Sequence, residues 1–251
     1  MRIDQVLATR LLSGDGMPTV RVYGWRPYAL SIGFHQQVSD FDTTECKNEG
    51  IDVVRRPTGG RAILHAEEVT YSVVMRAEGR SVSEIYAEIS QALVSGLRTL
   101  GADVEYASSQ PDFARLYRQK HSIPCFSSSA RFEIQSRGRK LVGSAQRRYL
   151  SPEGNEVVLQ HGSILLGPAH RRISEFVRPD NDNVQAMILA DLESKTTDLA
   201  SVLGRVVTYD EVAASTIMGF CQAWNIDPVE SPASDNELSD EAVFAVGNER
   251  L

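Results

Sequence analysis

The chain has 251 residues, of which 42% are hydrophobic and 24% charged, values typical of one large globular domain with room for a smaller appendage. No apolar run is long enough to cross a bilayer, and the N-terminus lacks the apolar core of a signal peptide, so we expect no membrane association and no secretion. The cysteines Cys46, Cys125 and Cys221 lie at distant, unpatterned positions, which argues against a disulfide framework or a zinc site and predicts a cytoplasmic location.

The net charge of -7 is unevenly distributed along the chain. Between Phe113 and Leu150 the only acid is Glu133, whereas acids outnumber basic residues from Asp180 onward. The basic residues of the middle segment are Arg115, Arg118, Lys120, Arg131, Arg137, Arg139, Lys140, Arg147 and Arg148. Such a block is often only a solvated face, but in an acidic protein it also suggests docking of an acidic partner or a phosphorylated group. Nucleic acid is not expected, because no aromatic-basic repeat accompanies the block.

In the first third of the chain, the spacing of apolar residues predicts a helix over residues 4–12 that stops at Gly14. Strands are expected at 19–25 and 30–34, joined by a turn that contains Pro27, and a further short strand ends at Val54. Residues 68–76 alternate in polarity, which predicts a half-buried antiparallel strand.

The clearest predicted helix begins at Ser81, which forms a capping-box pattern with Glu84, and stops at Gly101. A strand begins at 104–106, and another at 132–134 turns at 136–138 into a return strand over 140–146. Apolar runs at 157–159 and 164–166 flank a polar stretch, and beyond 180 the sequence becomes helical, with a final helix near 238–246. Helices and strands do not alternate as in a doubly wound sheet, so we expect an α+β fold with a mixed or antiparallel sheet.

The most informative stretch is Arg55-Arg56-Pro57-Thr58-Gly59-Gly60-Arg61, a turn between two short apolar runs. Glycines let a backbone approach a bound molecule closely, and arginines offer planar charged groups suited to phosphate or carboxylate. A solvated basic turn is the alternative interpretation.

Four further residues are candidates for chemistry. Cys125 lies in a Pro-Cys-Phe-Ser loop inside the basic block, where cations favour the nucleophilic thiolate, although a small buried hydrophobe is the alternative. Lys140 precedes the small residues Gly143-Ser144-Ala145, so it is either an exposed strand lysine or a lysine covered by substrate. His65 and His161 each adjoin a glycine-bearing segment and are either structural or functional.

Several common kinds of site have no support in the sequence. There is no histidine pair at helical spacing, no Asp-rich cluster and no Cys-x-x-Cys, so we expect no metal. A Gly-x-Ser-x-Gly elbow and a P-loop are also missing, which argues against a serine hydrolase or a Walker-type nucleotide site.

Together these motifs resemble the biotin/lipoate ligase and transferase family. The matching segments are residues 55–61 through His65, residues 140–146 and His161-Gly162-Ser163, in the right order over about residues 1–180. Lipoate-protein ligases of the family typically carry three successive glycines where this chain has Gly59-Gly60-Arg61. With Cys125 in its Pro-Cys-Phe segment, the chain looks like the cysteine-dependent octanoyltransferases of the LipM type.

The resemblance implies an α+β catalytic domain over 1–180, with a mixed, largely antiparallel sheet flanked by helices, and an acidic, mainly helical segment over 181–251 packed on it. It implies that Cys125 takes an octanoyl group from acyl carrier protein as a thioester and passes it to a lysine of a lipoyl-domain protein, such as glycine cleavage H protein. Lys140 would orient the acyl carbonyl or assist proton transfer. The implied acyl site is lined by Arg55, Arg56, Thr58, Gly59, Gly60, Arg61, His65, Gly143, Ser144, Ala145 and His161.

A thioester keeps the acyl group activated, so neither ATP nor another cofactor is expected. Both implied protein partners tend to be acidic, which would give the basic block a use. Three alternatives stay open: an ATP-dependent lipoate-protein ligase, an amidotransferase between carrier proteins, and a non-catalytic module that binds carrier proteins.

Overall fold

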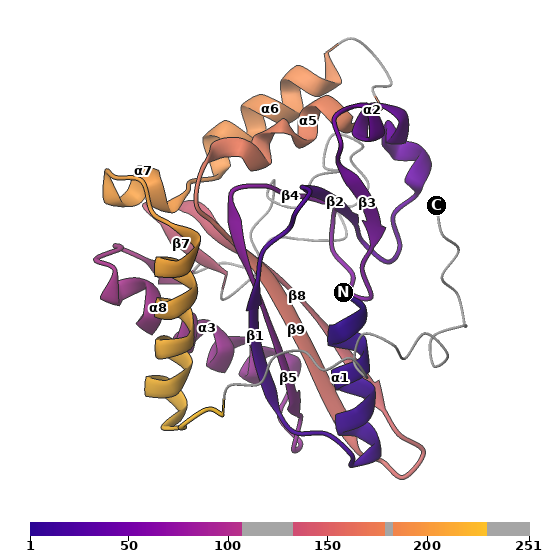
Figure 1. Cartoon of the computed structure of the whole chain (residues 1–251), viewed down its shortest axis with the longest axis vertical. Helices are drawn as coiled ribbons and strands as arrows, with labels where there is room; N and C mark the ends of the chain where they lie inside the picture. Colours follow the sequence, from indigo (N-terminus) through magenta and orange to yellow (C-terminus); the bar gives the residue numbers. More distant parts are fainter. Residues whose placement is uncertain (107–132, 179–182, 230–251) are drawn as a thin grey trace.

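A computed structural model of the chain describes residues 1–106, 133–178 and 183–229. Two β-sheets meet in the structure, and helices cover the outer faces of both sheets (Figure 1). In chain order the elements are α1 (Arg2–Ser13), β1 (Thr19–Tyr23), β2 (Ala29–Ile32), η1 (Val38–Asp40), α2 (Thr43–Asn48), β3 (Asp52–Arg55), β4 (Ile63–His65), β5 (Glu68–Arg76), α3 (Val82–Thr99), β6 (Glu105–Tyr106), β7 (Ile134–Ser136), β8 (Arg139–Leu150), β9 (Glu156–Leu165), η4 (Pro168–Arg172), α5 (Ile173–Phe176), α6 (Val184–Lys195), α7 (Leu199–Leu203) and α8 (Tyr209–Trp224).

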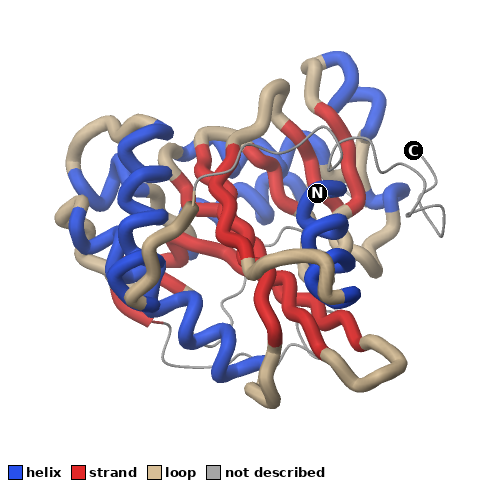
Figure 2. The backbone as a smooth tube through the Cα atoms, turned by 60° about the horizontal axis from the view of Figure 1, so that its bottom comes forward, coloured by secondary structure: helices blue, strands red, loops and turns tan. Residues whose placement is uncertain are grey.

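The larger sheet has the strand order β1-β5-β9-β8-β7-β6, and each neighbouring pair is antiparallel. The smaller sheet has the order β3-β2-β4, with β2 parallel to β3 and antiparallel to β4. Figure 2 shows the long strands of the larger sheet passing between helices on either side. The predicted α+β fold with a mixed, largely antiparallel sheet is therefore confirmed.

Local capping signals fix the ends of two helices as the sequence predicts. The Ser81 hydroxyl accepts a hydrogen bond from the Glu84 amide, and the Glu84 carboxylate accepts one from the Ser81 amide, so the capping box at the start of α3 is complete. Gly14 ends α1 in the left-handed conformation, with φ of 91°.

Both faces of the larger sheet are covered, which changes the expectation for β5. Val69, Tyr71 and Val73 pack into the core beneath α3 and α8, while Val74 packs on the other face against α1. Thr70 on that second face is also buried. The prediction of a half-buried strand is therefore wrong, because α1 and the smaller sheet cover the face that the sequence assigns to solvent.

Helices α3 and α8 approach closely where each has a glycine facing the other helix. A Cβ at Gly96 would meet the Ser215 carbonyl, and a Cβ at Gly219 would meet the Ala92 carbonyl. Phe220 of α8 lies in the same hydrophobic core as α3. The division of the chain into two units at residue 180 stays a prediction.

Two other features of the sheets are not specified by the sequence patterns. Strand β9 runs without a break through Gln160–Ser163, because β5 and β8 pair with it on both sides and supply its hydrogen bonds. Strands β1 and β2 belong to different sheets, so the turn at Pro27 carries the chain from one sheet to the other. The final helix predicted near 238–246 lies outside the described residues.

A separate core lies under the smaller sheet. Leu30, Ile32 and Leu64 of the sheet pack with Phe176 of α5 and Ile188 of α6. Figure 1 shows α2, α5 and α6 grouped at this end of the molecule. In the described part of the chain, no helix is both long and apolar enough to cross a membrane.

Candidate functional site

The arginine-glycine turn connects the two outer strands of the smaller sheet. Strands β3 and β4 both pair with β2, one on each side, so residues 56–62 must cross the end of β2. The Phe34 amide donates to the Thr58 carbonyl at 3.1 Å, which ties the turn to the chain that leaves β2.

Arg56 holds this turn from inside. Its guanidinium donates to the carbonyl oxygens of Gly59, Arg61 and Ser31, and to the Ser31 hydroxyl at 3.2 Å. The Arg56 residue is only 2% exposed, and Thr58 is fully buried. The interpretation of the segment as a solvated basic turn is therefore wrong.

Arg55 has a different task from Arg56. One of its Nη atoms donates to the carbonyl oxygens of Gly33, Phe34 and Gln36, at 2.8–3.2 Å. Gly60 has φ of 88°, and a Cβ on Gly33 would meet the Gly60 carbonyl, so the two segments touch through backbone atoms. Arg55 and Gly60 thus shape the turn, and their predicted place in an acyl site stays a prediction.

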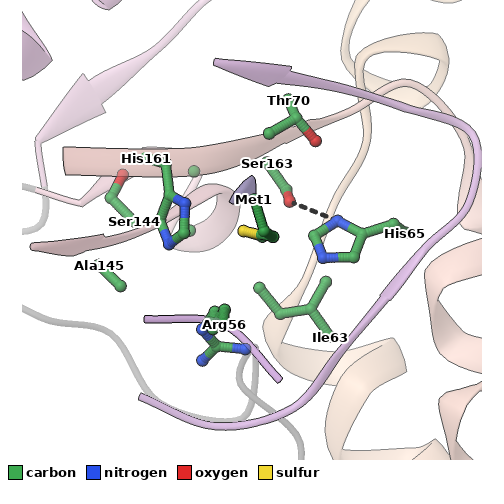
Figure 3. A pocket seen from close by; sticks show the side chains of 11 residues that line it. Met1, Arg56, Ile63, His65, Thr70, Ser144, Ala145, His161 and Ser163 are labelled. Carbon is green, nitrogen blue, oxygen red and sulfur yellow. Dashed lines mark hydrogen bonds between the residues drawn. The ribbon is translucent and has the colours of Figure 1, made fainter. Parts of the chain in front are cut away.

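A small pocket with a cavity volume of about 20 Å³ lies where the two sheets meet (Figure 3). Strands β8 and β9 form one wall, and residues of the arginine-glycine turn and β4 form the facing wall. The lining residues are Met1, Arg56, Ile63, His65, Thr70, Gly143, Ser144, Ala145, His161, Gly162 and Ser163. The three sequence motifs thus meet at one place: antiparallel pairing sets Gly143 opposite Ser163 and Ala145 opposite His161, and Arg56 and His65 line the same pocket.

His161 joins the two walls. Its Nε2 lies 2.6 Å from the Thr58 hydroxyl, while its Nδ1 has no hydrogen-bond partner among the described residues. Burial lowers the pKa of His161 to about 3, so the imidazole is neutral at pH 7. Figure 3 shows the ring between Ser144 and Met1. A neutral histidine with one unused ring nitrogen can donate a hydrogen bond to a ligand or accept one from it.

The wall formed by β8 and β9 is backed by buried polar groups. The Tyr71 hydroxyl lies 2.6 Å from the Ser144 hydroxyl and accepts a hydrogen bond from the Gln160 amide at 3.2 Å. Burial raises the pKa of Tyr71 to about 12, so the phenol stays protonated. A Cβ at Gly162 would meet the Gly143 carbonyl and come within 2.7 Å of the Tyr71 ring, so this position has no room for a side chain.

Lys140 does not line the pocket. It is 2% exposed, and its Nζ donates to Glu133 Oε1 at 2.7 Å, so the alternative of an exposed strand lysine is wrong. The Thr197 amide donates to the Lys140 carbonyl at 2.9 Å and fixes the start of β8. The predicted nucleophile, Cys125, lies outside the described residues.

Sequence reasoning missed several polar residues around the pocket, among them Ser31, Glu68 and Thr70. His65 Nδ1 lies 2.8 Å from Glu68 Oε1, and His65 Nε2 lies 2.7 Å from the Ser31 hydroxyl. The three-residue spacing between His65 and Glu68 was a weak available signal. Ser31 gave none, since it stands between apolar residues of a buried strand.

Residues 1–221 match the family model described as the lipoyl protein ligase A/B catalytic domain. The octanoyltransferase LipM of Kyrpidia tusciae is 36% identical over 250 residues, which cover 96% of this chain and 89% of that protein. The octanoyltransferase LipM of Geobacillus kaustophilus is 36% identical over 232 residues, which cover 90% of this chain and 82% of that protein.

Solved structures share the same fold. Lipoate-protein ligase A bound with ATP superposes with a TM-score of 0.74 and 21% identity, over 95% of this chain and 85% of that one. The bipartite lipoate protein ligase of Thermoplasma acidophilum superposes with a TM-score of 0.74 and 20% identity, over 95% of this chain and 84% of that one.

The fold is that of the lipoate-protein ligases, with a small pocket where the two sheets meet. The match over residues 1–221 and the identity with the two relatives show that the chain belongs to the lipoyl protein ligase A/B catalytic domain family. The predicted family is therefore confirmed, whereas the roles of the individual site residues stay predictions.

Proposed function

We propose that the chain is an octanoyltransferase of lipoate biosynthesis, which moves an octanoyl group from acyl carrier protein to a lysine of a lipoyl-domain protein. The observation that carries the proposal is the pocket. Its lining combines small and apolar residues such as Ile63, Gly143 and Ala145 with polar side chains that can contact the carbonyl of an acyl group, namely those of Arg56, His65, Thr70, Ser144, His161 and Ser163. Two relatives that are 36% identical to the chain are octanoyltransferases by name.

In the proposed reaction, the Cys125 thiolate attacks the carbonyl carbon of the donor thioester. A new carbon-sulfur bond to Cys125 forms, the bond to the carrier sulfur breaks, and the carrier leaves as a thiol after taking up a proton. The amine of the acceptor lysine then attacks the same carbon, so an amide forms and the Cys125 thiol is released. No ATP enters, because the acyl group stays activated throughout.

His161 and Lys140 have distinct proposed tasks. When the Thr58 hydroxyl donates to His161 Nε2, the proton of the neutral ring sits on Nδ1. That N–H has no partner in the described residues and can donate to the acyl oxygen as negative charge develops there. Lys140 would orient the acyl carbonyl or move a proton, and its ion pair with Glu133 fixes the position of its ammonium group before substrate binds.

The partners and the location are part of the same proposal. Arg147 lies beside the half-exposed ring of Phe34, 5.4 Å from its centroid, and donates to the Pro57 carbonyl. A cation and an aromatic ring next to the arginine-glycine turn suit an acidic carrier protein, with glycine cleavage H protein as the expected acceptor. Cysteine usage remains the basis for proposing a cytoplasmic location.

Mass spectrometry tests the proposal directly. The protein is incubated with octanoyl-acyl carrier protein in the absence of ATP, digested, and its peptides are weighed. We expect an octanoyl adduct on the Cys125 peptide that disappears in Cys125→Ser and persists in Cys221→Ser, the matched control.

Each other outcome selects an alternative. Strict ATP dependence with full activity in Cys125→Ser identifies a ligase and refutes the transferase. Turnover only with an octanoylated lipoyl-domain donor identifies an amidotransferase. Binding of carrier proteins with neither adduct nor turnover identifies a non-catalytic module.

A further inference from the structure

A chain of hydrogen bonds, buried from Thr70 onward, runs from Trp25 to the pocket. Trp25 Nε1 donates to the Thr70 hydroxyl at 2.9 Å, and the Thr70 hydroxyl donates to Glu68 Oε1. On the other side of Glu68, His65 Nδ1 lies 2.8 Å from the same carboxylate oxygen. The Trp25 ring also stacks on the His65 ring, with 4.4 Å between centroids, so the histidine is held by its face as well as its edge.

The chain continues from His65 into the arginine-glycine turn. His65 Nε2 lies 2.7 Å from the Ser31 hydroxyl, which accepts a hydrogen bond from Arg56 Nη1 at 3.2 Å. Glu68, His65 and Ser31 are each at most 6% exposed, so water cannot readily replace any of these bonds. The carboxylate of Glu68 is thus linked to the guanidinium of Arg56 through His65 and Ser31.

The direction of each bond follows from what each group can do. An arginine only donates, so the Ser31 proton is free to point at His65 Nε2. A carboxylate only accepts, so the proton between His65 and Glu68 belongs to Nδ1. Glu68 Oε2 has no hydrogen-bond partner among the described residues, which leaves no acceptor for a proton on that oxygen. The bonds to Glu68 and Ser31 are both made when His65 carries its proton on Nδ1 and accepts at Nε2.

We propose that Glu68 is a positioning residue, which holds His65 in this tautomer and through Ser31 fixes the guanidinium of Arg56 at the pocket. Arg56 then presents positive charge where the acyl oxygen gains negative charge. Glu68 itself does not line the pocket and does not touch the acyl group. The catalytic part of this inference rests on the proposed octanoyl transfer, whereas the tautomer does not.

Nitrogen-15 NMR of the histidine rings in the wild-type protein tests the tautomer without any substitution. We expect His65 to show a protonated Nδ1 and an unprotonated Nε2. Observation of the Nε2–H tautomer would overturn the proposal, whatever the enzyme assay shows. Failure of octanoyl transfer in the wild-type protein would instead remove the proposed function and leave the tautomer result standing.

Two substitutions separate the acceptor from the charge. Glu68→Gln keeps a carbonyl oxygen that accepts from His65 and Thr70, whereas Glu68→Met removes the acceptor. We expect Glu68→Met to shift His65 toward the Nε2–H tautomer and to lower kcat about tenfold or more, the scale of a lost hydrogen bond to a charged group. The KM for the octanoyl donor should change less than about twofold, because uniform binding is not removed.

Glu68→Gln should keep the Nδ1–H tautomer and most of kcat. Glu153→Gln, at the exposed tip of the β8–β9 hairpin, is the matched control for loss of one carboxylate. If Glu68→Met keeps full kcat, or if Glu68→Gln loses as much kcat as Glu68→Met with an unchanged tautomer, the positioning role is refuted. Should Glu68→Met fail to fold, the wild-type tautomer together with Glu68→Gln decides the question.

Discussion

The buried pair of Lys140 and Glu133 gives the sharpest test of how this site is built. Both side chains are at most 5% exposed, and 2.7 Å separates Lys140 Nζ from Glu133 Oε1. Lys140→Met keeps most of the volume but leaves the Glu133 carboxylate buried without that ammonium. Breaking a buried pair in this way costs about 3–5 kcal/mol. For a protein of this size, the loss corresponds to a fall in Tm of roughly 6–20 °C.

The double variant Lys140→Met/Glu133→Met should recover most of that loss. It replaces both charges with apolar groups, a change that is often close to neutral for a buried pair. Urea unfolding followed by circular dichroism gives the free energy of unfolding of the wild type, both single variants and the double variant. A Lys140→Met protein within about 1 kcal/mol of the wild type would refute the reasoning, because it would mean that water already reaches the pair.

The same double variant separates structure from chemistry. If Lys140 orients the acyl carbonyl or moves a proton, the double variant folds and still fails to transfer octanoyl groups. If the lysine only neutralises Glu133, the double variant regains activity together with stability. The single variant cannot make this distinction, since it loses both at once.

Further predictions concern the sheet, a helix end and pH. Gly162→Ala should lower the free energy of unfolding by about 1–3 kcal/mol, because the added Cβ meets the backbone of β8. Gly59→Ala, where a Cβ has open space, should leave the free energy of unfolding unchanged. Equal thermal unfolding of the two variants would contradict this. Ser81→Ala should cost about 1 kcal/mol by removing the α3 cap, with Ser83→Ala near neutral as the control; calorimetry measures both. Burial lowers the pKa of His170 to about 4, so between about pH 6.5 and 4 the unfolded state binds a proton that the folded state does not. Stability therefore falls as pH falls, by up to about 1.4 kcal/mol per pH unit, and His170→Gln should lessen this slope in urea titrations; parallel slopes would contradict it.

Local signals were enough to predict several elements. The α3 cap at Ser81, the left-handed Gly14 and the turn at 136–138 each depend on residues a few positions apart. The course of β9 through His161 and Gly162 could not be predicted in this way. A glycine-bearing polar stretch is typical of a loop, and only the two flanking strands make it a strand.

The site shows the same division between local and distant information. Arg56, His65 and His161 were identified from their motifs, and the structure brings them to one pocket. The burial of Lys140 depends on an ion pair with Glu133 that sequence spacing does not specify. The bond between Ser31 and His65 likewise depends on the pairing of β2 with β4, which sets Ala29 opposite His65.

The pocket also links the two sheets thermodynamically. One wall belongs to the ladder of β8 and β9, and the other is anchored on the smaller sheet through Ile63 and His65. A ligand that binds reversibly and contacts both walls stabilises the arrangement of the two sheets. At a concentration a hundred times its Kd, such a ligand stabilises the folded state by about 2.7 kcal/mol. The cohesion of the two sheets should therefore depend on occupancy of the pocket, and we expect the protein to resist heat and proteases most strongly when such a ligand is bound.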